Sequence, residues 1–423
     1  MQILHVAQRY WPALGGAESY IINISKRLAN EGHQVTVATT NALDFESFWS
    51  PKAKRVIEHE ATVDGVRVMR FPNRYIPLAE LSYPALRRLA WALARVTFVP
   101  AIWLHRLARL TPRTPELLRW LATTKQDFDI VAGITITFEA LIEAARQFAR
   151  KQQRPFVIYP LTHLGAGSQP GKDSASRLYT MRHQVETATK SDFLVAINTD
   201  EAEFYQRHGM PSERIAVVEP GVDLTELKGG NGERFRQQHG LRGPIIGVLS
   251  AMAFDKGVPH VVEAIRNLWQ QGIPAHLVLA GAVLEQFKRY LAKLPATDRS
   301  RLLVLGTVDH QTKLDLLDAI DLLALPSRTD AFGIVYLESW AYKKPVIAAQ
   351  TWGVRTVVKH GQDGLLVPFG DVRSLSQAIR LLIENHSLRK QLGEAGYRRV
   401  VSYYTWDRAY ARIREIYAQL ARK

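Results

Sequence analysis

The sequence predicts an α/β protein of two doubly wound domains, each built on a largely parallel β-sheet with helices on both faces. Its 423 residues are 47% apolar and only 22% charged, which is ordinary globular composition with enough chain for more than one core. Short apolar segments alternate with helical stretches along the whole length. The order strand, glycine-containing loop, helix, strand opens each half, so the second half repeats the architecture of the first.

The first half opens as a βαβ unit. A strand from Gln2 to Ala7 leads into a loop with adjacent glycines, a helix from Ala17 to Asn30 and a strand from Val35 to Thr39. The other strands of this half are expected at Val66–Phe71, Ile130–Ile134, Phe156–Tyr159 and Phe193–Ala196. We therefore expect residues 1–218 to form an N-terminal domain.

The second half starts again after a Gly- and Pro-rich stretch from Pro220 to Pro244. A strand from Ile245 to Leu249, a loop ending in Lys256-Gly257 and a helix from Pro259 to Gln271 form its opening unit. Its further strands are expected at His276–Ala280, Leu302–Leu305, Leu322–Leu325, Val346–Ala348 and Leu365–Val367. We expect residues 219–404 to form a C-terminal domain.

The last segment, residues 405–423, contains a helix expected from Trp406 to Ala421. Its apolar stripe must be buried against something and could close either domain. We expect it to pack back towards the N-terminal domain.

Composition excludes several classes of protein. The chain contains no cysteine, which removes disulfides, thiolate catalysis and cysteine metal sites and is typical of a reducing cytoplasm. No basic region precedes the first apolar segment, so we expect a strand there and not a signal peptide. The uncharged stretch from Val96 to His105 is about half the length of a membrane-spanning helix. We expect a cytoplasmic protein that does not cross a membrane.

A polar loop between a buried strand and a helix carries the most specific signal. It reads Pro326-Ser327-Arg328-Thr329-Asp330-Ala331-Phe332-Gly333, and a helix is expected to begin near Ile334. A helix N-terminus after a glycine presents N–H groups that suit a diphosphate. Glu338, one turn into the helix, can accept hydrogen bonds from both hydroxyls of a ribose, and Asp330 can accept hydrogen bonds from sugar hydroxyls. A surface loop with incidental carboxylates would show the same spacing.

With its surroundings, this segment resembles the acidic signature of family 4 of the retaining glycosyltransferases, in which seven residues separate two carboxylates. The similarity continues through Lys344–Ala348, His360–Pro368 and Pro220–Asp223 and covers essentially the whole chain. It implies the GT-B fold, in which two Rossmann-like domains face each other across a cleft. It also implies a nucleotide-sugar donor, a hydroxyl acceptor in a glycolipid, lipid-linked or polysaccharide precursor, and transfer with retention of anomeric configuration.

The resemblance assigns roles to particular residues. Lys256 would neutralise the leaving diphosphate, while Asp330 and His163 would contact the transferring sugar, so these three form the expected catalytic set. The segment Asp127-Phe128-Asp129 is similar to the metal-binding Asp-x-Asp motif of the other glycosyltransferase fold, but it precedes a strand instead of following one, so no metal site is expected. No cofactor is expected either, because the dinucleotide-binding fingerprint is absent. The expected donor-binding residues are Gly15, Gly16, Arg328, Phe332, Gly333, Ile334 and Glu338.

Four positions depart from the pattern of that family. Asp330 replaces the more usual Glu, and Lys343 stands where Gly is common. Ala251 replaces an arginine that usually binds the diphosphate, and Arg328 is the candidate to compensate. Residues 351–355 form an atypical glycine-rich turn. Two alternatives stay open: a catalytically weak GT-B scaffold that binds an anionic membrane or nucleic acid, and a sugar-nucleotide epimerase of the same fold.

Positive charge is concentrated in one segment. The formal net charge is +15, and Leu81–Lys125 contains eight Lys or Arg and one acidic residue. Its arginines alternate with Trp, Phe and Leu, which is typical of helices on an anionic membrane surface, here the inner face. A helical pair packed on its own domain with a solvated basic face has the same composition. Nucleic acid is not an expected partner, because no recognised binding motif accompanies the charge.

Overall fold

The computed structural model describes residues 1–13 and 15–422, and the chain divides into two compact units. Unit 1 contains the described residues of 1–162 and 176–219 and those from Ala409 onward, and unit 2 contains residues 163–175 and 220–408. The expected boundary at residue 218 placed the segment 163–175 in the N-terminal domain, but it is part of unit 2. There Trp352 donates its backbone N–H to the Gly165 carbonyl at 3.0 Å and its indole N–H to the Gly167 carbonyl at 2.8 Å.

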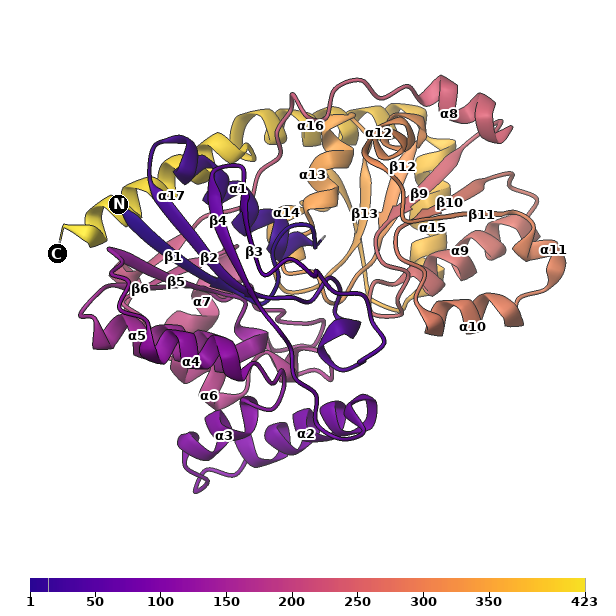
Figure 1. The fold of residues 1–423 in the computed structure, drawn as a ribbon. Coiled ribbons are helices and arrows are strands. Elements are labelled where there is room, and N and C mark those ends of the chain that lie inside the picture. The colour runs from indigo at the N-terminus through magenta and orange to yellow at the C-terminus, as the bar shows by residue number, and fades with distance from the viewer. Residues whose placement is uncertain (14, 423) are drawn as a thin grey trace. The chain divides into compact units, whose positions relative to one another are not determined.

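Unit 1 is built on an eight-stranded sheet of order β3-β4-β2-β1-β5-β6-β7-β8 (Figure 1). Neighbouring strands are parallel except for the antiparallel pair of β3 and β4 at one edge. The inner strands β5 and β6 are buried along their whole length, as a sheet covered on both faces requires. The strands are β1 (Gln2–Ala7), β2 (Gln34–Thr40), β3 (Glu60–Val63), β4 (Val66–Phe71), β5 (Ile130–Ile134), β6 (Phe156–Tyr159), β7 (Phe193–Ala196) and β8 (Ile215–Val217).

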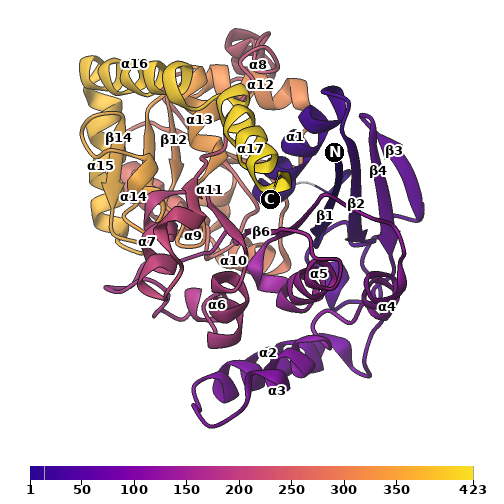
Figure 2. The same cartoon turned by 90° about the vertical axis from the view of Figure 1, so that its left-hand side faces the viewer.

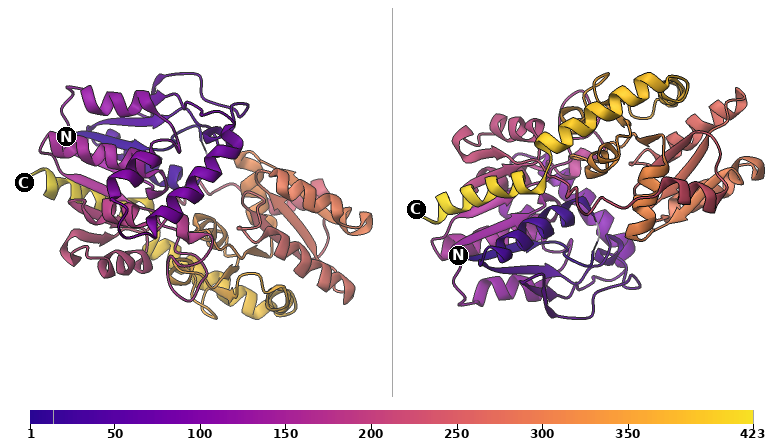
Figure 3. Two further views of the ribbon diagram at one scale, coloured as in Figure 1. Left: turned by 90° about the horizontal axis from the view of Figure 1, so that it is seen from below. Right: turned by 90° about the horizontal axis from the view of Figure 1, so that it is seen from above.

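The helices of unit 1 are α1 (Gly16–Asn30), α2 (Ala79–Ala94), α3 (Ala101–Ala108), α4 (Pro115–Thr123), α5 (Glu139–Lys151), α6 (Arg182–Thr189) and α7 (Thr199–Arg207). Helices α2 and α3 lie side by side at the periphery of this unit (Figures 1 and 2). In the view from below they lie toward the viewer (Figure 3, left).

The C-terminal helix α17 (Trp406–Ala421) belongs to unit 1 from Ala409 onward. Its Tyr417 hydroxyl lies 3.0 Å from His5 Nε2 and accepts a hydrogen bond from Tyr159 at 3.0 Å. Ile413 and Tyr417 are fully buried. The predicted apolar stripe therefore buries against the inner strands β1 and β6.

Unit 2 is built on a six-stranded parallel sheet of order β11-β10-β9-β12-β13-β14. Its strands are β9 (Ile245–Leu249), β10 (His276–Ala280), β11 (Leu302–Gly306), β12 (Leu322–Leu325), β13 (Val346–Ala349) and β14 (Gly364–Val367). Its helices are α8 (Gly232–His239), α9 (Val258–Gln270), α10 (Glu285–Lys293), α11 (Ala296–Arg299), α12 (His310–Ala319), α13 (Ile334–Ala341), α14 (Val354–Val357), α15 (Val372–Glu384) and α16 (His386–Tyr403).

The strand order of unit 2 reverses between β9 and β12. The chain leaves β9 for β10 on one side and β12 for β13 on the other, so the loops after β9 and β12 diverge at a topological switch point. Ligands of open α/β sheets bind at such points, beyond the carboxyl ends of the strands. The sheet of unit 2 thus positions the loops at 250–257 and 326–333 for ligand binding.

The predicted fold class of two parallel-sheet α/β domains is confirmed. Each strand expected from the sequence is present within one residue of its predicted bounds. The sequence prediction missed the short edge strands β3 and β8. Strand β3 has no continuous apolar run and is partly exposed, and β8 is apolar but only three residues long. No helix among the described residues is both long enough and apolar enough to span a bilayer.

Candidate functional site

The two loops at the switch point of unit 2 are held together tightly. The Asp255 carbonyl accepts the backbone N–H of Arg328 at 2.9 Å, and the Asp255 carboxylate contacts the Arg328 guanidinium at 2.5 Å. Gly257 has a φ of 75°, and a Cβ at this position would lie 2.3 Å from the Pro326 carbonyl oxygen. Only glycine permits this approach, so Gly257 fixes where the preceding lysine emerges.

Lys256 and Asp330 form an ion pair between these loops. The Lys256 ammonium lies 2.5 Å from Asp330 Oδ1, and their side chains are 26% and 16% exposed. Burial raises the pKa of the Asp330 carboxyl, but the Lys256 charge outweighs burial and holds that pKa below its usual value. Within the described part of the chain, Asp330 Oδ2 has no hydrogen-bond partner. This oxygen is buried as well as unpartnered, so it can accept a hydrogen bond from a ligand hydroxyl once the ligand reaches it.

His163 belongs to the same unit and to the same electrostatic environment. Burial lowers the pKa of its imidazole to about 4, with a further lowering by the Lys256 charge and a smaller opposing effect of Asp330. The ring is therefore neutral at neutral pH and can donate or accept a hydrogen bond without adding positive charge. The three residues expected to form the catalytic set thus influence one another within unit 2.

Helix α13 begins at Ile334, where the sequence predicted it. Its N-cap, Gly333, has a φ of 89°, and a Cβ there would lie 2.3 Å from the ring of Tyr336. The hydroxyl of Tyr336 donates to the Leu325 carbonyl at 2.8 Å, which ties the first turn of α13 to the end of β12. Because Gly333 has no side chain to cap the helix, the first N–H groups of α13 are suited to an anion.

Two expected donor-binding side chains already have other contacts. Phe332 is 2% exposed and packs edge-on against Tyr404, with ring centroids 5.8 Å apart, so only its backbone is placed for a ligand. Arg328 is paired with Asp255 and lies over the ring of Phe369 at 5.1 Å. Arg328 is the candidate to bind the diphosphate in place of the arginine that the family usually has at position 251. It would do so either by leaving these contacts or from its present position.

Glu338 has a partner that the sequence did not reveal. The ammonium of Lys313, on α12, lies 2.6 Å from Glu338 Oε1, and the two side chains are 31% and 16% exposed. Lys313 lies 25 residues before Glu338 in the chain and outside any motif. The contact orients the carboxylate before any ligand binds.

Gly15 and Gly16 lie in unit 1, at the start of α1, and both are exposed. A Cβ on Gly15 would lie 2.2 Å from Glu18 Oε2, whereas one on Gly16 would meet nothing within 4 Å. Beneath Gly15, Glu18 forms a buried ion pair with Arg9 at 2.9 Å. This pair was not identified from the sequence, although Glu18 directly follows Gly15-Gly16-Ala17.

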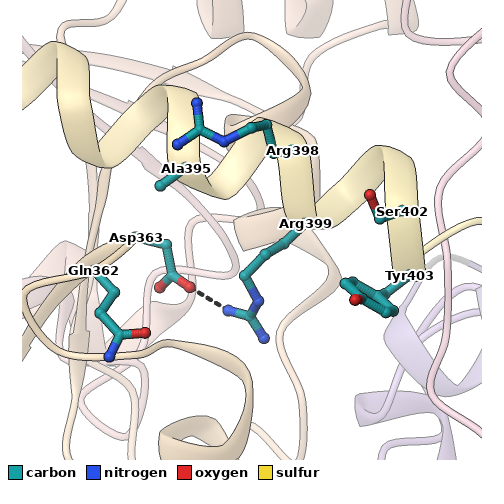
Figure 4. A pocket seen from close by; sticks show the side chains of 7 residues that line it. All are labelled: Gln362, Asp363, Ala395, Arg398, Arg399, Ser402 and Tyr403. Atoms are coloured by element: carbon teal, nitrogen blue, oxygen red, sulfur yellow. Dashed lines mark hydrogen bonds and ion pairs between the residues drawn. The ribbon is translucent and has the colours of Figure 1, made fainter.

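A small pocket elsewhere in unit 2 contains none of the expected site residues (Figure 4). It lies between the turn that carries Asp363 and helix α16, where Arg399 points toward the Asp363 carboxylate and pairs with it. Its lining residues are Gln362, Asp363, Ala395, Arg398, Arg399, Ser402 and Tyr403. Among residues 1–13 and 15–422, no group of three or more His, Asp or Glu side chains is arranged to hold a metal ion.

Two family profiles match the chain. The family described as Glycosyl transferases group 1 matches residues 231–399, and the Glycosyl transferase 4-like domain matches residues 15–221. The matched regions contain most of both units, including the β12–α13 loop and the Gly15-Gly16 turn. The chain belongs to the group 1 glycosyltransferases, and the resemblance based on its acidic signature is confirmed.

Individual relatives agree with this family. A D-inositol 3-phosphate glycosyltransferase of Xylanimonas cellulosilytica is 30% identical over 252 residues, covering 56% of this chain and 59% of that protein. One of Catenulispora acidiphila is 25% identical over 419 residues, covering 95% and 90%. An α-D-kanosaminyltransferase of Streptomyces kanamyceticus is 27% identical over 222 residues, covering 50% and 56%. The matched region thus spans less than two thirds of the first and third relatives.

Solved structures show the same fold. The structure of Anabaena HepE in complex with UDP-glucose has a TM-score of 0.72 and 20% identity, covering 99% of this chain and 100% of that one. The sucrose-phosphate synthase of Thermosynechococcus elongatus has a TM-score of 0.71 and 20% identity, covering 99% of each chain. At this identity the likeness concerns the fold.

Proposed function

We propose that this protein is a retaining, metal-independent glycosyltransferase that moves a hexosyl group from a nucleotide-diphosphate donor to a hydroxyl acceptor. The observation that carries the proposal is the Lys256–Asp330 ion pair, 2.5 Å long, at the switch point where α13 also begins. The group 1 family and the UDP-glucose bound to HepE support a nucleotide-sugar donor. The D-inositol 3-phosphate glycosyltransferases among the relatives support a hydroxyl acceptor.

In this mechanism the donor diphosphate lies between Lys256 and the first N–H groups of α13. The bond between the anomeric carbon and the β-phosphate oxygen breaks while the acceptor oxygen bonds to the same face of that carbon. The acceptor proton passes to a β-phosphate oxygen, so no protein carboxylate serves as a covalent nucleophile. Lys256 and the helix start stabilise the negative charge that develops on the leaving diphosphate.

The remaining site residues position the two ends of the donor. Asp330 Oδ2 accepts a hydrogen bond from one hydroxyl of the transferring sugar, and the neutral His163 imidazole forms a hydrogen bond with a second hydroxyl of that sugar. Glu338, oriented by Lys313, accepts the ribose hydroxyls. Holding both ends aligns the anomeric carbon for attack. The acceptor in this proposal is a glycolipid, lipid-linked or polysaccharide precursor, used in the cytoplasm at the inner face of a membrane.

A panel of nucleotide sugars tests this proposal. Purified protein is incubated with UDP-, GDP- and ADP-sugars, and release of free nucleotide is followed together with the anomeric configuration of the transferred sugar. A transferase slowly hydrolyses at least one donor, and the rate falls when Lys256 is replaced by alanine. An inactive binding scaffold releases no nucleotide, and an epimerase converts the sugar while it stays attached to the nucleotide. Either outcome would overturn the proposal.

A further inference from the structure

The α2–α3 hairpin of unit 1 has a packed inner face. Ala90, Ala94 and Leu104 are buried with Met181 in a small core of their own. On the same side of α2, the guanidinium of the buried Arg87 contacts the fully buried Glu139 carboxylate at 2.6 Å. These contacts anchor the hairpin to unit 1, so its outer face is not needed for its folding.

The connection between the two helices is also fixed. Arg182, at the start of α6, donates to the carbonyl of Ala94 at 3.0 Å and to that of Val96 at 3.3 Å, and it also reaches the Val99 carbonyl. The loop that carries Phe98 is therefore held from beneath. Phe98 itself points out, with 85% of its surface exposed.

The outer face of the hairpin is apolar. Along α2 the exposed positions include Leu81, Ala85, Leu89 and Ala92, which follow the three- and four-residue spacing of one helix face. Large apolar side chains on this face are far more exposed than a solvated surface would favour. They are Leu81 at 71%, Leu89 at 47%, Phe98 at 85%, Ile102 at 52% and Trp103 at 57%.

Apart from Glu80 in the first turn of α2, whose carboxylate accepts a hydrogen bond from Ser50 at 2.8 Å, the charges on this face are positive. Arg88, Arg95, Arg106 and Arg109 are exposed. Within the described part of the chain, no carboxylate lies within ion-pair distance of these four guanidinium groups, and the sequence has no acidic residue from Leu81 to Pro115. Arg106 lies over the ring of Trp103 at 5.0 Å, so cation and aromatic ring are presented together.

We propose that this outer face docks the protein on an anionic lipid bilayer. Aromatic and leucine side chains with guanidinium groups around them match the acyl boundary and the phosphate headgroups of such a surface. A second copy of the chain fits less well, because two-fold pairing would bring the arginines of both copies together. Nucleic acid offers phosphates but no layer that would bury Leu81 and Phe98. Docking rests on the proposed function and specifies the surface by which the enzyme would reach a lipid-linked acceptor at the membrane.

Vesicle co-sedimentation tests the docking with the full chain. Wild-type protein should sediment with vesicles of phosphatidylglycerol and phosphatidylcholine at low salt and stay in solution with pure phosphatidylcholine. Neutralising two arginines in Arg95→Gln/Arg106→Gln should weaken partitioning roughly 30-fold, from the contribution of each basic residue near an anionic surface. Phe98→Ser/Trp103→Ser should weaken it by at least as much, because it removes the inserted side chains.

A matched control is Arg373→Gln/Lys390→Gln, which removes two exposed charges from unit 2 and should leave binding unchanged. Donor hydrolysis should be the same in all four proteins, so loss of docking is distinguished from loss of catalysis. Equal sedimentation with neutral and anionic vesicles, or equal binding by the control and the hairpin variants, would overturn the proposal. So would a dimer in solution that Phe98→Ser/Trp103→Ser dissociates, or nucleic-acid binding in place of vesicle binding.

Discussion

The switch-point loops of unit 2 and the outer face of the α2–α3 hairpin in unit 1 are both rich in charge, but only the first is rich in ion pairs. The arginines of the hairpin face have no carboxylate within ion-pair distance in the described part of the chain. In the loops, opposite charges meet at 2.5 Å in the pairs Lys256–Asp330 and Arg328–Asp255, and next to them Lys313 of α12 meets Glu338 of α13 at 2.6 Å.

This difference separates a prepared small-molecule site from an extended surface. Groups that act on one ligand must be held in position before it binds, because the free energy needed to order them would otherwise raise the barrier of the reaction. Groups that face a bilayer only need to be present at high density, because the headgroups are mobile. Under the two proposals, the paired charges belong to the donor site and the exposed, unpaired charges belong to the docking surface.

The largest expected effect is that of Lys256→Ala. Loss of the ammonium that stabilises the leaving diphosphate should lower turnover by about 100- to 1,000-fold. Steady-state rates of donor hydrolysis and of transfer measure this, with the thermal midpoint showing that the fold persists. Lys293→Ala, which removes an exposed lysine on α10, is the matched control and should keep full activity. Equal rates for the two variants would remove Lys256 from the site.

The next expected effect concerns pH and His163. Its pKa falls from 6.5 in the unfolded chain to about 4 in the folded protein, so between these values the unfolded state binds a proton that the native state does not. Stability is therefore lost as the pH falls from about 6.5 towards 4, by up to roughly 3 kcal/mol from this one group.

Urea unfolding near neutral pH and near pH 4 measures this contribution in wild type and in His163→Gln. The buried His5 of unit 1, whose pKa is lowered to about 3, has an effect of the same sign but is present in both proteins and cancels. The wild type should lose more stability on acidification than the variant. The same loss in both proteins would show that His163 is not neutral in the native state.

Replacing one glycine in each unit by alanine compares the two units through the free energy of unfolding. Gly333→Ala places a Cβ at a φ of 89° against the Tyr336 ring and should destabilise by about 1–3 kcal/mol. Gly16→Ala meets nothing within 4 Å at the first residue of α1 and should change stability by less than about 0.5 kcal/mol. Denaturant unfolding ranks the two, and a larger effect at Gly16 would contradict the geometry of both turns.

The smallest expected effect is that of Lys313→Met. If Lys313 only orients Glu338 toward a ribose, its loss should raise KM for the donor about 3- to 10-fold and leave kcat nearly unchanged. Lys313→Arg should restore most of the affinity because it keeps the charge next to Glu338 Oε1. A fall in kcat with unchanged KM would assign Lys313 to the chemical step instead.

The sequence predicted the fold and the local part of the site because both depend on short-range patterns. Strand and helix periodicity defined the two sheets, and the segment from Asp330 to Glu338 placed the start of α13 at the correct residue. A local pattern does not show which way a side chain points, so the buried position of Phe332 against Tyr404 was not predicted.

Contacts between distant segments were beyond the sequence for a physical reason. Lys313 meets Glu338 only because α12 and α13 pack on the same sheet, and Arg87 meets Glu139 across 52 residues. The placement of residues 163–175 in unit 2 depends in the same way on hydrogen bonds from Trp352. Each contact follows from the packing of elements that sequence periodicity alone does not arrange.

The central claim is that Lys256 and the start of α13 bind one diphosphate, and calorimetric titration with nucleotides tests it most directly. UDP, GDP and ADP are compared with the corresponding monophosphates on wild type, Lys256→Ala and Lys293→Ala. We expect wild type and Lys293→Ala to bind one diphosphate at least tenfold more tightly than its monophosphate, and this preference to collapse in Lys256→Ala, since a charge-assisted phosphate contact is worth more than one factor of ten. An equal diphosphate preference in all three proteins would contradict the account.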